Sequence, residues 1–199
     1  MQVNLEKSFP LEASPAAAWS VLQDIEAVAG CMPGAELTEK VDDSHYKGQV
    51  RVKVGPASAT FKGDIEVRGL DPGERELHLF GKGADTKGTS TASMELTARV
   101  RDAEGGAELV GTSQVTVSGK MASFGGRMMN QVSEQILKQF GANFADRALA
   151  AGEGADAGEA AERVAQQPRE LNGLALAWSV VVGFIKSLFG RGKTGHADR

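Results

Sequence analysis

"MASFGGRMMNQVSEQILKQFGANF" (residues 121–144) places large apolar side chains at every fourth position along most of its length. The members of this stripe are Phe124, Met128, Val132, Ile136, Phe140 and Phe144. Residues four apart lie above one another on a helix, so the stretch predicts one long amphipathic helix. An apolar stripe of this length needs a surface to cover, and the preceding residues have to supply it.

Residues 36–119 alternate with a period of two instead. In "HYKGQVRVKV" (45–54), Val50 and Val52 share one face with Tyr46, while charged and polar residues occupy the other. The same alternation recurs in residues 57–69, 75–83, 89–102 and 107–119. This pattern predicts antiparallel strands with one covered face and one wet face.

A strand and two short helices are expected before this run. "QVNLEKSF" (2–9) alternates, and Ser14 with Pro15 forms the start signal of a helix. A second short helix ends in a turn at Gly30, Pro33 and Gly34. We therefore predict an α+β helix-grip fold: a curved antiparallel sheet of about seven strands is wrapped around a long C-terminal helix, with an apolar cavity between them.

Several phrases of the sequence resemble a known family. They are "CMPGAEL" (31–37), "KVGPASATFKGDIEV" (53–67), "KGADTKGTSTASMELTARV" (82–100) and "SGKMASFGGRMMNQVSEQILKQFGANF" (118–144). The arrangement resembles the START/Bet v 1-like (SRPBCC) superfamily, and the phrases resemble its carbon monoxide dehydrogenase CoxG family. The resemblance covers about residues 1–148.

The resemblance carries its own expectations. Members of the superfamily hold apolar ligands between sheet and helix. The family implies an accessory role to a molybdenum-containing CO dehydrogenase or a related hydroxylase, in association with the membrane. It does not imply that this chain carries the redox cofactors.

Composition and charge exclude several other classes. The single cysteine, Cys31, excludes an internal disulfide and a multi-cysteine metal site. The net charge is −4, and residues 1–149 are themselves acidic, so no nucleic-acid partner is expected. The first residues carry Glu6 and Lys7 and lack the apolar core of a secretory signal, so a cytoplasmic protein is expected.

No enzyme active site is predicted. His45 and His78 fall on polar strand faces, His196 lies near the end, and no pair has metal-ligand spacing. Cys31 has no local basic partner. We expect no catalytic and no metal-binding residues, since a hydrolase or cyclase on this fold needs an ionisable cluster inside the cavity.

"GKGADTKGTS" (81–90) is glycine-rich and holds two lysines, but it lacks the spacing of a phosphate-binding loop. A mobile hairpin loop is the better interpretation. The family resemblance also allows a loop at the cavity rim that contacts a partner.

The inward-facing residues favour a cavity when taken as a set, although each alone is explained as core. Small residues such as Gly48, Ala59 and Ala92 leave volume unfilled, and methionines line the start of the long helix. The predicted ligand-binding residues are Met32, Val50, Val52, Ala59, Phe61, Ile65, Leu79, Met94, Leu96, Met121, Phe124, Met128, Val132, Ile136 and Phe140.

Beyond residue 149 two further segments are expected. Residues 150–170 are rich in alanine, glycine and glutamate, which predicts a flexible acidic linker between the domain (1–149) and the tail. Residues 171–199 form an amphipathic, hydrophobic tail with a basic end. Its predicted membrane-binding residues are Leu174, Trp178, Val181, Val182, Ile185, Lys186, Leu188, Phe189, Arg191 and Lys193.

The tail has three possible partners: a membrane, a partner subunit or the protein's own core. Its apolar run, interrupted by Lys186 and carrying Trp178 in the middle, fits a helix lying in the membrane interface better than a full span. A basic end is attracted to an anionic membrane surface. A peripheral protein on the inner face of the cell membrane is therefore expected.

A cavity, a leash and a membrane-seeking tail together suggest a carrier. The hypothesis is that the chain takes an isoprenoid quinone (menaquinone or ubiquinone) from the membrane and presents it to the dehydrogenase, with no covalent cofactor. The alternative is a membrane anchor that recruits the dehydrogenase and transports no ligand.

Overall fold

The computed structural model describes residues 1–54, 57–153 and 155–167. A seven-stranded antiparallel sheet runs in the order β1-β7-β6-β5-β4-β3-β2. The strands are β1 (Gln2–Leu11), β2 (Ala35–Lys40), β3 (His45–Val54), β4 (Ala57–Asp71), β5 (Glu76–Asp85), β6 (Ser90–Ala103) and β7 (Gly106–Gly119). The helices are α1 (Pro15–Leu22), α2 (Ile25–Cys31), α3 (Gly125–Ala150) and α4 (Ala155–Ala165), with a 3₁₀ turn η1 (Lys120–Phe124) before α3. The predicted helix-grip fold is confirmed.

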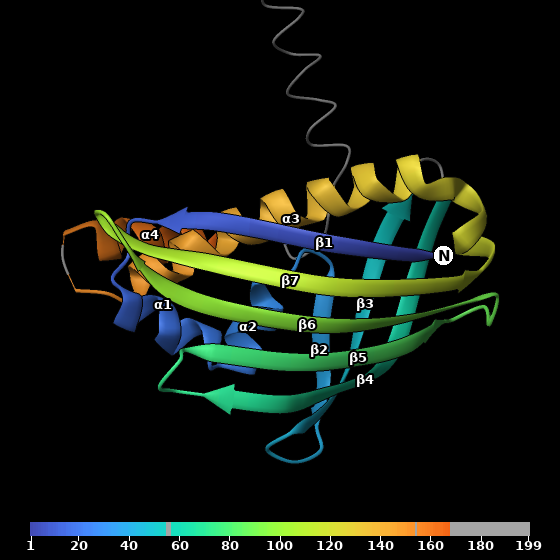
Figure 1. Ribbon diagram of the computed structural model, residues 1–199, viewed down its shortest axis with the longest axis horizontal. Helices are drawn as coiled ribbons and strands as arrows, with labels where there is room; N and C mark the ends of the chain where they lie inside the picture. The colour runs from blue at the N-terminus through green and yellow to red at the C-terminus, as the bar shows by residue number, and fades with distance from the viewer. Residues whose placement is uncertain (55–56, 154, 168–199) are drawn as a thin grey trace, which may run out of the picture.

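The two short helices begin where capping side chains stand. The Ser14 hydroxyl accepts a hydrogen bond from the Ala17 amide at 3.2 Å, and Pro15 occupies the first helical position. Asp24 caps α2 in the same way through the amides of Glu26 and Ala27. Together these caps fix α1 and α2 at one end of the sheet, where Figure 1 shows them below α4.

The sheet is strongly curved, and β4 carries much of the bend (Figure 1). Gly63 of β4 pairs with Gly83 of β5, and a Cβ on Gly63 would lie 1.9 Å from the Lys82 carbonyl oxygen. Only glycine allows the two backbones to approach this closely. As a result the β3–β4 hairpin turns across the other strands toward the start of α3.

The main core lies between the sheet, α1, α2 and the second half of α3. Leu22, Leu77, Leu109 and Phe144 are almost completely inaccessible to solvent there. Alternation along the strands places their odd or even apolar residues on this concave face, as the period of two predicts. The core therefore closes one end of the grip and leaves the other end to different residues.

Part of the predicted flexible linker is a packed helix. Residues Ala155–Ala165 form α4, Ala160 is completely buried against α3, and Arg163 donates to Asp146 at 2.8 Å. The linker prediction is wrong for these residues because small alanines pack closely on a neighbouring helix without large apolar side chains. The boundary of the tail at residue 171 stays a prediction.

Among the described helices, none combines the length and the hydrophobicity that crossing a membrane requires.

Candidate functional site

A second apolar cluster lies at the other end of the grip, between the sheet and the first half of α3. Phe61, Val117 and Met121 are buried in it. Half-buried apolar residues pack around these three: Val50, Val52, Ala59, Ala92, Val115, Phe124, Met128, Met129 and Val132. We call this set the opening cluster. Most of its members keep solvent exposure, so the sheet and α3 cover them only in part.

Helix α3 thus has two different halves. Its buried residues are Gly141, Asn143, Phe144 and Ala148, all in the second half. A Cβ on Gly141 would lie 2.3 Å from the Phe9 ring, so helix and sheet are in close contact there. In the first half Met128, Met129 and Val132 are only half-buried. The apolar stripe is therefore packed at one end and partly open at the other.

The structure divides the predicted ligand-binding residues into groups. Eight of them join the opening cluster: Val50, Val52, Ala59, Phe61, Met121, Phe124, Met128 and Val132. Ile65, Leu79, Leu96 and Phe140 belong to the main core or pack against it. Met94 and Ile136 are half-buried. Met32 lies apart from both clusters, in the wall of a separate pocket.

That pocket, of about 590 Å³, lies between the turn after α2, strand β3 and the ends of α3 and α4. Met32, Pro33 and Gly34 form one wall, and Arg147 of α3 and Gln167 after α4 form another. The Nε of Arg147 and the Oε1 of Gln167 are buried without a hydrogen-bond partner among the described residues. The predicted apolar mouth at Met32–Gly34 therefore borders a polar pocket.

Cys31 lies behind this pocket. Burial raises the pKa of its thiol to about 12, although the positive charge of Arg147 acts in the opposite direction. The Asn143 side chain donates a 2.9 Å hydrogen bond to the Cys31 carbonyl oxygen and so ties α3 to the end of α2. A thiol in this state is a structural residue and not a nucleophile.

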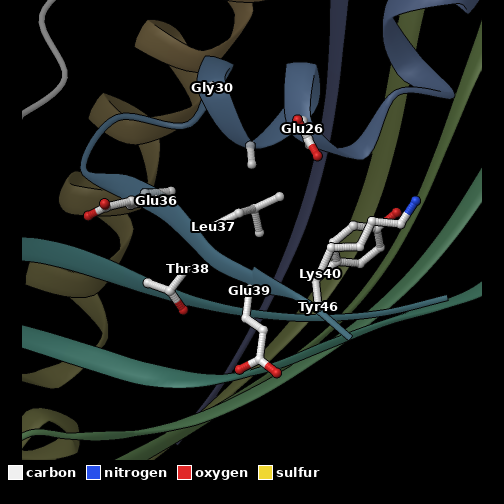
Figure 2. A pocket seen from close by; sticks show the side chains of 10 residues that line it. Glu26, Gly30, Glu36, Leu37, Thr38, Glu39, Lys40 and Tyr46 are labelled. Carbon is white, nitrogen blue, oxygen red and sulfur yellow. The ribbon is translucent and has the colours of Figure 1, made fainter. Parts of the chain in front are cut away.

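A smaller pocket, of about 340 Å³, lies between α2 and β2. Figure 2 shows Glu26 and Gly30 above it, Leu37 pointing into it, and Lys40 beside the Tyr46 ring. The Lys40 nitrogen lies 6.0 Å from the ring centroid and 3.0 Å from Asp43. Its charges are thus on the surface and already paired in part, which does not suit an apolar ligand.

The ionisable groups do not form a catalytic centre. His45 bonds Asp42 at 2.9 Å, and His78 bonds Glu76 at 2.7 Å and Thr97 at 3.0 Å. Within residues 1–54, 57–153 and 155–167, no group of three His, Cys, Asp or Glu side chains is placed to hold a metal ion. The histidine pairs lie among the polar strand positions, as the alternation predicts.

The turn between β5 and β6 is ordered by Asp85. Its carboxylate accepts from the Lys87 amide at 2.6 Å and from the Thr89 hydroxyl at 2.6 Å. The "GKGADTKGTS" stretch is therefore a hairpin, as predicted, but one fixed by its own side chain. The ten predicted membrane-binding residues, Leu174 to Lys193, lie outside the described residues.

A family model described as the CoxG subunit of carbon monoxide dehydrogenase matches residues 8–149. The chain belongs to this family. The match confirms the resemblance carried by the four sequence phrases and covers the sheet and α3 together. The CoxG family is named for a subunit of CO dehydrogenase. No curated protein matches the chain.

Solved structures similar to this CoxG family member show the fold alone. A conserved protein from Geobacillus kaustophilus has 21% identity and a TM-score of 0.63, covering 74% of this chain and 95% of its own. The Zhui aromatase/cyclase from Streptomyces sp. R1128 has 16% identity and a TM-score of 0.52, with coverage of 82% and 96%. A protein from Thermus thermophilus has 14% identity and a TM-score of 0.52, with coverage of 77% and 100%.

Sequence reasoning missed the polar pocket of this CoxG family member. Arg147 and Gln167 meet the turn at Met32 only after α4 has folded back onto α3. The sequence signal was present in part, because Arg147 breaks an otherwise apolar helix end. Its partners come from segments that no local pattern connects.

Proposed function

We propose that this protein is an accessory component of a CO dehydrogenase or a related hydroxylase, and that it carries an isoprenoid quinone between the membrane and that enzyme. The observation that carries the proposal is the opening cluster, a half-covered apolar set inside a fold of the CoxG family. The family supports the link to the dehydrogenase. The quinone and the membrane are our own additions.

An isoprenoid chain fits the opening cluster by its chemistry. Buried apolar area is the main source of affinity for such ligands, and flexible methionines adapt to them. Met121, Met128 and Met129 stand at the start of α3 opposite Phe61 and Val52. The isoprenoid tail would lie between these two sets of side chains and complete their burial.

The dehydrogenase partner explains why the ligand would be a quinone. Electrons taken from a substrate need an acceptor, and respiratory quinones are dissolved in the bilayer. A carrier with an apolar interior moves such a molecule across water without exposing its chain. The chain itself supplies no redox group in this scheme.

A variant of the opening cluster tests the proposal. Val132→Trp places a large ring into the space and is expected to reduce quinone uptake from liposomes by at least about tenfold, since it occupies volume that the ligand needs. Gln135→Trp is the matched control, because Gln135 is exposed on the same helix. Uptake is measured by extraction and absorbance after the liposomes are removed.

Equal uptake by the two variants would contradict the proposal, provided that both melt within a few degrees of the parent protein. An artificial membrane tether separates carriage from recruitment. If tethered Val132→Trp protein restores full CO-dependent respiration, the chain acts as an anchor and transports no ligand.

A further inference from the structure

Cationic groups gather around the opening cluster. They are the amino group of Met1 and the side chains of Lys53, Lys62, Lys87, Lys120 and Arg127, and we call them the basic rim. All five side chains are exposed. None of the five forms an ion pair with another residue of the part of the chain that the structure describes.

The topology places these groups at one end of the sheet. The Lys120 amide donates to Thr89 at 3.0 Å, next to the turn that carries Lys87. The Met1 amino group donates to the Val117 carbonyl oxygen at 2.7 Å. Figure 1 shows the N-terminus, the β5–β6 turn and the start of α3 together at this end.

The carboxylates at this end do not neutralise the rim. Asp64 pairs with Lys82 at 3.9 Å, and Asp85 is occupied by the hydrogen bonds of its own turn. No acidic residue occurs between Glu108 and Glu134 along the chain. The end that holds the opening cluster therefore carries a net positive charge.

The opposite end of the sheet is acidic. It holds the β4–β5 and β6–β7 turns, with Asp71, Glu74, Asp102 and Glu104 exposed. The arginines there are paired: Arg75 contacts Asp102 at 3.2 Å, and Arg99 contacts Glu76 at 2.7 Å. The net charge of −4 thus conceals a molecule with a basic end and an acidic end.

We infer that the basic rim docks the open end of the grip onto an anionic bilayer, with the opening cluster facing the lipid. The inference rests on the proposed function and names the face through which the ligand would pass. Lysines near an anionic surface attract it, and the acidic end is repelled, so the charges orient the molecule. Apolar residues inside the rim favour lipid over nucleic acid, which would need polar groups that contact phosphate and bases.

Environment-sensitive fluorophores on the full-length chain test the orientation. Native Cys31 is completely buried, so Thr86→Cys at the rim and Ala103→Cys at the acidic end each supply one accessible thiol. The vesicles are free of quinone and contain phosphatidylcholine with or without phosphatidylglycerol. The inference expects a blue-shifted, brighter Thr86 probe with phosphatidylglycerol only, and an unchanged Ala103 probe.

Charge reversal gives the second arm. Lys87→Glu with Lys120→Glu should weaken binding to phosphatidylglycerol vesicles at least about tenfold, and rising salt should remove the difference. Arg101→Glu with Lys138→Glu changes the net charge equally at exposed sites away from the rim and should have a much smaller effect.

Equal losses for the two double variants, or an unresponsive Thr86 probe on bound protein, would overturn the inference. So would tighter binding of the rim to duplex DNA than to anionic vesicles. Because the vesicles contain no quinone, docking can succeed while quinone carriage fails. The reverse result, quinone uptake with an unresponsive rim, would remove only the docking inference.

Discussion

Single residues decide where the chain turns and which groups stay inert. Ser14, Pro15 and Asp24 start two helices through hydrogen bonds that their sequence positions predict. Gly34, at a φ of +79°, ends the turn after α2 in a conformation that favours glycine. Local rules of this kind depend on neighbouring residues only, so the sequence was sufficient for them.

The Cys31 thiol should be almost unreactive in the native protein. Its pKa of about 12 leaves very little thiolate at neutral pH, and its side chain is buried. We expect labelling by iodoacetamide at least about a hundredfold slower than in urea-unfolded protein. Mass spectrometry of timed samples measures this ratio, and similar rates in both states would show that the α2 end opens freely.

The Asp85 turn should make stability depend on pH. The hydrogen bond from the Thr89 hydroxyl, with two backbone amides, lowers the pKa of Asp85 against the opposing effect of burial. A lowered folded-state pKa stabilises the fold above the unfolded-state value of about 3.9, and this stabilisation is lost as the pH falls through the folded-state value.

Asp85→Asn should therefore lower the urea midpoint at neutral pH, and its difference from the parent should shrink below about pH 4. Glu104→Gln, in an exposed turn, is the control. A difference that persists unchanged into acid would show that the turn does not need the charge.

At the scale of elements, α3 is fixed to the sheet by its second half. Gly141 lets the helix approach β1, where Phe9 and Phe140 meet edge to face with ring centroids 6.3 Å apart. The first half rests on the half-buried opening cluster. We expect the first half to be the part that moves when a ligand enters, because fewer contacts hold it.

Two alanine substitutions in α3 test this difference. Gly141→Ala should destabilise the protein by roughly 1–2 kcal/mol, since its Cβ would collide with the Phe9 ring and the gain in helix propensity offsets only part of this. Gly126→Ala has no atom within 4 Å of the new Cβ and should be neutral or stabilising by about 0.5 kcal/mol. Urea unfolding measures both, and equal effects would contradict the division of the helix.

The elements also show why sequence reasoning succeeded and where it stopped. Alternation fixed the faces of β3 to β7, because a strand cannot change face without a bulge. It placed Ile65, Leu79 and Leu96 in the cavity together with Phe61, although the bend of β4 assigns those three to the main core. Residue parity gives the face of a strand but not the position of a residue under a curved sheet. The same limit hid α4, whose packing depends on Ala160 and not on a large apolar residue.

At the scale of the whole molecule, charge and apolar exposure lie at the same end. Totals along the chain gave an acidic body, and the lysines of the basic rim come from strands, turns and helix that only the fold brings together. Sequence counts therefore missed this end. The fold combines a closed core, a half-covered apolar cluster and a charged rim, which suits a carrier that exchanges its cargo at a membrane.

The most direct measurement is native mass spectrometry of the full-length protein purified from a bacterium that makes isoprenoid quinones, followed by extraction and absorbance. The account predicts one quinone per chain, lost in Val132→Trp and retained in Gln135→Trp. Protein that is empty after purification, and stays empty after incubation with quinone-containing liposomes, would contradict the account.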